Sequence, residues 1–244
     1  MVRMKVSVVV PAYNEEKLLG ESLGRIRAAM VPFERSGWSA ELIVCDNNST
    51  DRTAEIAAAA GARVVFEPIN QISRARNTGA AAATGDWLVF VDADSHPSPE
   101  LMSDVVQTLQ RGEVVAGGAT VAIDTGRAAV RAAVAGWNLL SRLTRWAAGS
   151  FIFCEAATFR QVGGFSQTLY AAEEIDLFRR LKREARRLRR RIVILHRHPL
   201  QTSGRKAELY SPREALLFNL RVLLTAGRSL RDPKGAHLWY DGRR

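Results

Sequence analysis

The chain has 244 residues, 47% of them hydrophobic, which is enough for one α/β domain with a sizeable core and excludes a disordered or fibrous protein. Lys and Arg number 35 against 25 Asp and Glu, and the net charge of +10 favours anionic partners. Cys45 and Cys154 stand in apolar runs, which indicates reduced, buried thiols rather than a disulfide framework or a zinc cluster. Neither a signal peptide nor an apolar run of roughly 20 residues is visible, so we expect a cytoplasmic protein.

The first 110 residues alternate short β-branched runs with helical patterns, as successive βαβ units around a mostly parallel sheet do. The expected strands cover residues 5–11, 41–46, 63–67 and 87–91. Helices are expected between them, over about 19–30, 54–60 and 75–83. The strands lead into the polar loops PAYNEE, DNNSTD and DADS. Because ligands of open α/β sheets bind at the carboxyl ends of the strands, we expect a site where these loops converge.

The second half of the chain continues the sheet and adds helices. Ser98 followed by proline is typical of a helix start and predicts a helix to about residue 110. Three further strands are expected over 114–123, 150–154 and 192–195. Three further helices are expected over about 127–148, from about 172, and from Ser211, where Ser211, Pro212 and Glu214 form a capping box. No repeat or low-complexity linker divides the chain, so we expect one domain.

A basic cluster occupies residues 179–191, where nine of thirteen positions are Lys or Arg. An apolar stripe at helical spacing lies beneath it, made of Leu177, Leu181, Ala185 and Leu188. Two interpretations stay open: a solvated helix face, or a surface that attracts a phosphorylated acceptor, an anionic membrane or nucleic acid. Residues 127–148 are also amphipathic, which suits a helix packed on the sheet or one lying over an acceptor region or a membrane surface.

The segment VFVDADS is an apolar strand that ends in two carboxylates, Asp92 and Asp94, separated by one small residue. Carboxylates at this spacing can turn toward a common point in the loop. Their hard oxygen ligands suit magnesium or manganese, which commonly keeps substrate phosphates as further ligands. For the tripeptide alone, a solvated turn that caps the next helix is the commoner explanation.

Four segments of the chain, in order, resemble the family 2 glycosyltransferases, which are inverting nucleotide-diphospho-sugar transferases. They are VSVVVPAYNEE (6–16), LIVCDNNSTDRT (42–53), RARNTGAAAATGDWLVFVDAD (74–94), and GGF followed by AAEEIDLFRRL (171–181). The resemblance covers about residues 5–206. It implies a single-domain A-type glycosyltransferase fold with a mostly parallel, Rossmann-like central sheet flanked by helices. Its nucleotide-binding part is expected over about 1–110, its acceptor-side part over about 111–206 and a helical tail over about 207–244.

The same resemblance implies a donor site. The residues expected to bind the nucleotide-sugar are Pro11, Ala12, Tyr13, Glu15, Asp46, Arg76, Asp92, Ala93 and Asp94. Asp46 is expected to accept a hydrogen bond from the base, since an ionised carboxylate favours a base edge that offers N–H. Arg76 is expected near the diphosphate, with a surface ion pair as the alternative. Asp92 is expected to face the ribose or sugar, and Asp94 to bind Mn²⁺ or Mg²⁺.

For the acceptor, the resemblance implies a general base at the second residue of an acidic pair. That position is Glu174 in this chain, where aspartate is commoner in the family. Glutamate can perform the same proton transfer with one more methylene of reach. Glu173 and Asp176 lie beside it. Glu174 and Asp92 are therefore the expected catalytic residues.

The segment HRHPLQTSGRK follows the last expected strand and offers two imidazoles and further cations. Some A-type transferases take an extra metal ligand from a histidine in this region, and we prefer His198 over His196. Arg205 and Lys206 are candidates to clamp phosphate.

Together these expectations describe a metal-dependent inverting glycosyltransferase that moves a sugar from a UDP- or GDP-linked donor to a hydroxyl acceptor. A sugar nucleotidyltransferase is the first alternative, although PAYNEE is acidic where a glycine- and lysine-rich loop is expected. A non-catalytic basic binding module on the same fold is the second. No nucleic-acid partner is expected, because the sequence lacks an aromatic-basic recognition motif. The cytoplasmic protein is expected to contact the anionic inner face of the membrane peripherally.

Overall fold

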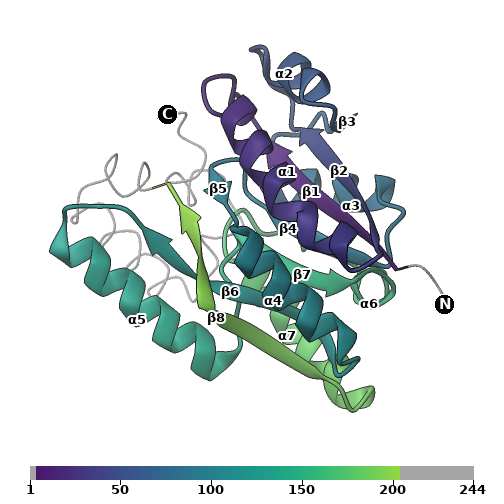
Figure 1. Ribbon diagram of the computed structural model, residues 1–244, viewed down its shortest axis with the longest axis vertical. Helices are drawn as coiled ribbons and strands as arrows, with labels where there is room; N and C mark the ends of the chain where they lie inside the picture. Colours follow the sequence, from purple (N-terminus) through teal and green to yellow (C-terminus); the bar gives the residue numbers. More distant parts are fainter. Residues whose placement is uncertain (1–3, 204–244) are drawn as a thin grey trace.

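Eight strands form one sheet in the computed structural model, which describes residues 4–203 (Figure 1). The spatial order of the strands is β3-β2-β1-β4-β7-β6-β8-β5. Their bounds are β1 Lys5–Ala12, β2 Ser39–Asp46, β3 Arg63–Phe66, β4 Trp87–Val91, β5 Ser95–His96, β6 Val114–Ile123, β7 Phe151–Glu155 and β8 Arg191–Thr202. Strands β1 to β4 are mutually parallel, as are β6 and β8, whereas β7 and β5 run antiparallel to their neighbours. The predicted α/β class with a mostly parallel central sheet is confirmed.

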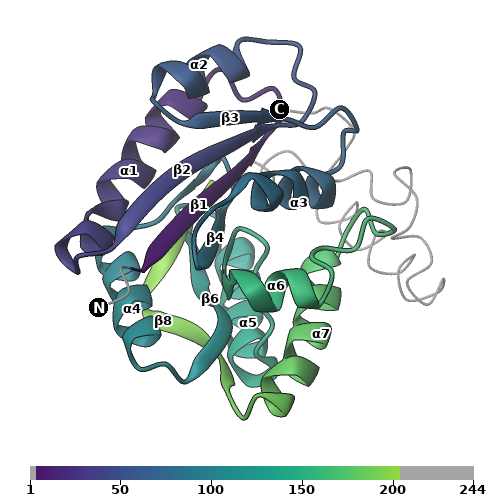
Figure 2. The ribbon, with the colours of Figure 1, turned by 90° about the vertical axis from the view of Figure 1, so that its right-hand side faces the viewer.

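Seven helices occur in the described part of the chain. Their bounds are α1 Leu19–Arg35, α2 Thr53–Ala59, α3 Ile72–Ala82, α4 Pro99–Gln110, α5 Ala128–Thr144, α6 Ala156–Gln161 and α7 Glu173–Arg187. Helices α1 and α4 cover one face of the sheet, and α3, α6 and α7 cover the other (Figure 2). Helix α4 begins as expected, because the Ser98 hydroxyl accepts the Leu101 amide and proline occupies the first turn.

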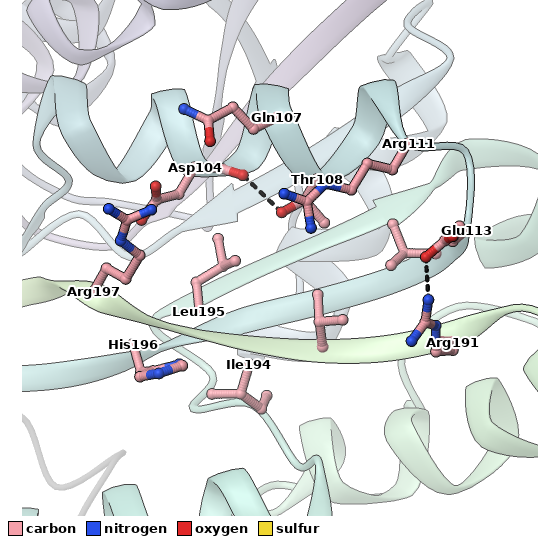
Figure 3. Close-up of a pocket in the computed structure, with 12 residues that line it drawn as sticks. Asp104, Gln107, Thr108, Arg111, Glu113, Arg191, Ile194, Leu195, His196 and Arg197 are labelled. Atoms are coloured by element: carbon pink, nitrogen blue, oxygen red, sulfur yellow. Dashed lines mark hydrogen bonds and ion pairs between the residues drawn. The ribbon is translucent and has the colours of Figure 1, made fainter.

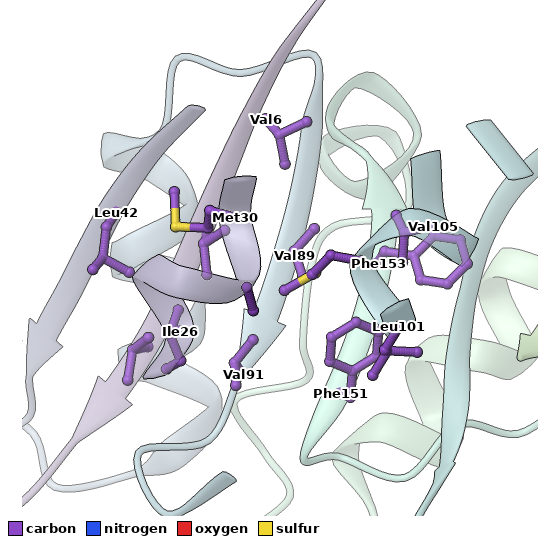
Figure 4. Close-up of a cluster of buried hydrophobic side chains, with 14 of the residues drawn as sticks. Val6, Ile26, Met30, Leu42, Val89, Val91, Leu101, Val105, Phe151 and Phe153 are labelled. Atoms are coloured by element: carbon purple, nitrogen blue, oxygen red, sulfur yellow. The ribbon is translucent and has the colours of Figure 1, made fainter. Parts of the chain in front are cut away.

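The central strands are almost wholly apolar because the sheet is buried on both faces. In β1, Val8 and Val10 belong to the core cluster of α1 and α4, whereas Val9 belongs to the cluster of α3 and α7. Each fully buried valine contributes about 1.5–3 kcal/mol to folding. Figure 4 shows part of the first cluster, with α1 and α4 packed over the sheet through Ile26, Met30, Leu101, Val105, Val89, Val91, Phe151 and Phe153.

Pro11 lies inside a central strand, where a residue without an amide N–H normally weakens pairing. Strand β1 pairs with β2 through Ala12, but its pairing with β4 ends at Val9. Strand β1 therefore stays paired with β2 but separates from β4 at its carboxyl end, and Pro11 comes after the last pair with β4. This separation opens the sheet edge where the polar loops begin.

The expected strand 192–195 is wrong in length, because β8 has 12 residues and continues to Thr202. Its pairing with β6 is irregular between Leu195 and Leu200, so the strand accommodates the polar segment HRHP, including Pro199, as a bulge. The short strand β5 and helix α6 were not predicted, since two and six residues carry too little periodicity to read.

Helix α5 is shorter than expected, since Arg145 adopts a left-handed backbone with φ of 52° and ends it. Val134 and Trp137 pack against the core, but Leu139, Leu140 and Leu143 are exposed. The helix lies at the outer edge of the molecule, beneath β6 and β8 in Figure 1. None of the described helices has the length and apolarity to cross a membrane.

The cysteines and the C-terminal segment were the subject of two further expectations. Cys45 and Cys154 are free and buried, as expected from their apolar surroundings. The helix predicted from Ser211, with its capping box, and the phosphate-clamp candidates Arg205 and Lys206 lie outside the described residues.

Candidate active site

The loops after β1 and β2 are joined by hydrogen bonds into one wall. The Asn14 side-chain oxygen accepts the Thr50 amide at 2.8 Å, and the Asn14 amide donates to the Ser49 hydroxyl at 3.0 Å. The Glu15 amide donates to the Thr53 hydroxyl at 2.8 Å. Asn14 has a positive φ of 51°, a conformation that asparagine tolerates better than most residues. The segments PAYNEE and DNNSTD, identified separately in the sequence, are thus adjacent.

The residues expected around the nucleoside lie along this wall. Pro11 and Ala12 are buried at the end of β1, and Ala12 is in register with Asp46 at the end of β2. Tyr13 and Glu15 follow in the loop. The Asp46 side chain is almost fully buried, and its Oδ1 accepts the Ser49 amide at 3.1 Å. No described residue hydrogen-bonds to the second carboxylate oxygen of Asp46, which is the acceptor that a base needs.

A buried amide pair, which sequence reasoning missed, links this wall to the acceptor side. The Asn47 side chain donates to two carbonyls and accepts one amide within residues 67–71. The Gln71 side chain then donates to the carbonyls of Gln167 and Leu169 at 3.0 and 2.9 Å. These contacts fix the segment before α7 against the end of β2. The only signal in the sequence was the pair of asparagines in DNNSTD, which a turn alone explains.

Arg76 of α3 is the centre of a buried ionic network. Its Nη1 donates to Glu173 at 2.7 Å, and its Nη2 donates to Asp92 at 2.8 Å and to the Gly149 carbonyl at 2.9 Å. The guanidinium also stacks over the Phe165 ring at 5.2 Å. Burial by itself lowers the pKa of Arg76, but the two carboxylates outweigh it and hold that pKa above its usual value. The network therefore joins α3, the end of β4 and the start of α7.

Two expectations about Arg76 need correction. The side chain is not on the surface, since only 1% of the residue is exposed. It also does not present its guanidinium to a diphosphate, because both terminal nitrogens are already bound to protein oxygens. Arg76 instead positions Asp92 and Glu173. The RARN segment gave no sign of this, since a partner 97 residues away is visible only in the fold.

Arg76 pairs with only one member of the acidic pair at the start of α7. Glu173 is buried in the ion pair, whereas Glu174 is part-exposed and forms no ion pair with any described cation. Burial and the neighbouring charge of Glu173 raise the pKa of Glu174 to about 8. A carboxyl group with such a pKa holds its proton at neutral pH and becomes available as a base as the pH rises through about 8. The geometry thus leaves Glu174, and not Glu173, available for proton transfer.

Asp92 and Asp94 leave β4 on either side of the buried Ala93. Asp92 accepts the Arg76 bond and retains 19% exposure of its side chain. The Asp94 carbonyl accepts the Ser203 amide at 3.1 Å, and its carboxylate lies part-exposed beyond the strand end. No group of three or more His, Cys, Asp or Glu side chains suited to a metal occurs within residues 4–203. Mn²⁺ or Mg²⁺ commonly needs only one or two carboxylates when substrate phosphates complete its shell, so this pair fits such an ion.

His198 does not join Asp94. It lies in the bulged part of β8, and its Nδ1 is 2.9 Å from Oδ2 of Asp104 on α4. This pairing accounts for the imidazole as a link between β8 and α4. The expectation that His198 binds metal is therefore not supported by its position. The polar motif HRHP resembles a loop in the sequence, although it lies within β8.

The model of glycosyl transferase family 2 matches residues 7–165. The chain belongs to this family. The matched region contains the wall formed after β1 and β2, the Arg76 network through Asp92, and both carboxylates after β4.

Two curated relatives of this family 2 glycosyltransferase are informative. It is 32% identical over 121 residues to the dolichol-phosphate mannosyltransferase of Pyrococcus furiosus, covering 46% of this chain and 32% of that protein. It is 36% identical over 124 residues to the undecaprenyl-phosphate 4-deoxy-4-formamido-L-arabinose transferase of Pseudomonas aeruginosa, covering 46% and 34%. The matches thus span about a third of these relatives' length.

Solved structures share the fold. The Staphylococcus aureus TarS 1–349 complex with UDP-GlcNAc has a TM-score of 0.66 at 21% identity, covering 96% of this chain and 69% of that one. The Pyrobaculum calidifontis mannosyltransferase PcManGT, in complex with GDP-Man and Mn²⁺, has a TM-score of 0.63 at 21% identity, covering 82% and 56%. The A-type fold expected from the sequence is confirmed.

Proposed function

We propose that this chain is a metal-dependent inverting glycosyltransferase that moves a sugar from a UDP- or GDP-linked donor to a hydroxyl acceptor. One observation carries the proposal: Arg76 pairs with Asp92 and Glu173 and leaves Glu174 unpaired at the sheet edge from which Asp94 emerges. Neighbours with GDP-Man and UDP-GlcNAc support either nucleotide.

In the proposed donor site, Pro11, Ala12, Tyr13 and Glu15 line the nucleoside, and the free oxygen of Asp46 accepts an N–H of the base. Both uracil and guanine offer such a group, which is why the carboxylate alone does not choose between them. Asp92 faces the ribose or sugar, beside Ala93. Its orientation is fixed by Arg76, which binds only one of its two oxygens.

In the proposed reaction, Glu174 accepts the proton of the acceptor hydroxyl as its oxygen attacks the anomeric carbon. The bond between that carbon and the diphosphate oxygen breaks on the opposite side, so the configuration inverts and the nucleoside diphosphate departs. A general base of this kind contributes about 10²- to 10⁴-fold to the rate. Mn²⁺ or Mg²⁺ held by Asp94 supplies charge stabilisation for the departing diphosphate.

We also propose that the protein acts in the cytoplasm and contacts the anionic inner face of the membrane peripherally. The basic surface of α7 supports this contact, since about 1 kcal/mol of attraction accompanies each Lys or Arg near such a surface. Two relatives are named for transfer to dolichol phosphate and undecaprenyl phosphate. Polyprenyl phosphates are therefore the first acceptors to test.

The proposal is tested by following nucleoside diphosphate release from UDP- and GDP-linked hexoses, with Mn²⁺ and a panel of acceptors that begins with polyprenyl phosphates. We expect acceptor-stimulated release from donors of one nucleotide class. Glu174→Gln should reduce this release about 10²- to 10⁴-fold while leaving donor binding intact. Equal release by wild type and Glu174→Gln would remove Glu174 from the mechanism.

A further inference from the structure

A cavity of about 590 Å³ lies between the end of α5, the second half of α7 and the start of β8. Six of its eleven lining residues are cations, and none is an acid; the cations are Arg142, Arg145, Lys182, Arg186, Arg190 and Arg191. This cavity is separate from the proposed donor site, whose residues do not line it.

Four of these cations have no carboxylate partner among the described residues. Arg190 pairs with Glu155 and Arg191 with Glu113, but no described acid pairs with Arg142, Arg145, Lys182 or Arg186. Burial, followed by the charges of Arg145 and Arg186, lowers the pKa of Lys182. Like charges held this close repel one another. An anion bound among them would be attracted by all of these cations and would offset their repulsion.

Two residues that line the cavity carry buried hydrogen-bond donors without partners. The buried Nε1 of Trp146 and the buried Nε of Arg190 have no hydrogen-bond partner in the described part of the chain. The Trp146 ring is itself held by Lys182, whose Nζ lies 5.1 Å from the ring centroid and donates to the Thr144 carbonyl. Buried donors without partners are costly, and both of these belong to residues beside the cationic cavity.

A second cavity of about 400 Å³ lies between α4 and β8 (Figure 3). It also contains arginines, but its cations are accompanied by acidic residues. Its lining includes both Asp104 and Glu113, and Glu113 binds Arg191. Mixed charges neutralise one another there. Of these two cavities, only the one beside α5 has no acidic residue in its lining.

Exposed leucines adjoin the cationic cavity. Leu143 lines it and is 75% exposed, and Leu139 and Leu140 on α5 are 59% and 44% exposed. Apolar side chains beside a cationic pocket suit a lipid, whose phosphate and acyl chains need both surfaces. Residues 204–244 contain nine Lys and Arg against four Asp and Glu, so this segment has the same sign of charge as the cavity and does not complement it.

From these observations we infer that the α5–α7 cavity binds the phosphate headgroup of an anionic bilayer lipid, with Leu139, Leu140 and Leu143 entering the apolar edge of the bilayer. The inference deepens the proposed membrane contact and rests on it, but not on the donor or the base. It assigns that contact to one cavity, away from the loops that receive the nucleotide-sugar.

The test is co-sedimentation of the full chain with phosphatidylcholine vesicles, with and without phosphatidylglycerol. We expect binding only to vesicles with phosphatidylglycerol, and at least about a tenfold weaker partition for Arg142→Glu/Arg186→Glu. The matched control is Arg35→Glu/Arg160→Glu, which makes the same change in net charge. All four arginines are exposed and lie in the last turn of their helices. Equal loss in both double variants would overturn the assignment to this cavity, as would equal binding to neutral vesicles.

Leu143→Ser distinguishes a lipid from a free phosphate ion. We expect it to weaken vesicle binding several-fold, with inorganic phosphate competing poorly. Full vesicle binding by Leu143→Ser, together with competition by inorganic phosphate, would show a site for free anions and overturn the lipid assignment. A thermal shift with UDP or GDP and Mn²⁺, unchanged in the cavity variants, reports donor binding separately, so failure of the donor proposal is distinguishable from failure of this one.

Discussion

The charged groups at the sheet edge and those between α5 and α7 are organised in opposite ways. At the sheet edge, Arg76 is fully buried and pairs with two carboxylates. Between α5 and α7, most cations that line the cavity have no described carboxylate partner. A buried, paired charge holds other groups in place, whereas an unpaired cluster near the surface is free to receive a ligand. The comparison therefore distinguishes a buried, paired residue that holds the active site in place, such as Arg76, from unpaired surface cations that can bind a ligand.

The largest expected effect tests the unpaired member of the acidic pair. Glu174→Gln keeps the size of the side chain but removes its ability to accept a proton, so the turnover rate should fall about 10²- to 10⁴-fold. The thermal shift caused by the donor nucleotide should remain. Steady-state rates with the donor and acceptor found for the wild type check this. A normal rate in Glu174→Gln would mean that the unpaired carboxylate is not the base.

The next largest effect is expected on stability, from replacing the paired cation Arg76. Arg76→Met leaves Asp92 and the buried Glu173 without their partner, which should lower the free energy of unfolding by about 3–5 kcal/mol. Urea unfolding measures this change. Arg74→Met is the control, because Arg74 is only part-buried and its side chain has one hydrogen bond among residues 4–203, to Gln71. Similar losses in the two variants would contradict the organising role of Arg76.

Alanine variants of two asparagines, one near the active site and one on α5, compare the effects of the two regions on stability and turnover. Asn77 donates to and accepts from the Phe165 backbone near the sheet edge, and Asn138 does the same with Val121 beneath α5. Replacing either by alanine should cost about 1–3 kcal/mol of unfolding free energy, because backbone groups lose their partners. Only Asn77→Ala should also slow turnover. Equal slowing in both variants would place α5 in the catalytic machinery.

The pH dependence of stability sharpens the distinction between the two glutamates. The pKa of Glu174 rises from 4.5 to about 8 on folding, so the folded protein binds the extra proton between these values. Its contribution to stability is complete below pH 4.5 and is lost as pH rises through about 8. Glu174→Gln should therefore gain stability relative to wild type over this interval, as followed by urea unfolding across pH. A constant difference between the two proteins would contradict the raised pKa.

The smallest effect is expected at the cationic cavity. Arg142→Glu/Arg186→Glu breaks no described ion pair, so the free energy of unfolding should change by no more than about 0.5 kcal/mol. Thermal unfolding at low and high salt checks this expectation. A loss comparable to that of Arg76→Met would show that these cations hold the fold together, contrary to the comparison.

Much of the fold was readable because its elements bury apolar faces. The central strands have continuous valine runs, and the spacing of Leu19, Leu23 and Ile26 on α1 follows the buried face of that helix. Strand β8 was misjudged because its polar bulge resembles a loop. Short elements such as β5 gave no periodic signal.

The candidate site was readable only in part. Residues at strand ends, such as Asp46, Asp92 and Asp94, could be named because a parallel sheet brings strand ends together. The partners of Arg76, Asn47 and His198 could not, since each depends on contacts between residues distant in the chain. A motif locates a side chain on an element, but long-range packing decides what that side chain touches.

The most direct test of the central claim is a thermal-shift measurement with UDP and GDP, each with and without Mn²⁺, on wild type, Asp94→Ala and Asp124→Ala. Asp124 is an exposed aspartate beyond β6 and serves as the control. A ligand that binds the native state raises the melting temperature by mass action. We predict a Mn²⁺-dependent rise with one nucleotide that survives in Asp124→Ala and disappears in Asp94→Ala. No rise with either nucleotide, or an undiminished rise in Asp94→Ala, would contradict the proposed metal-assisted donor site.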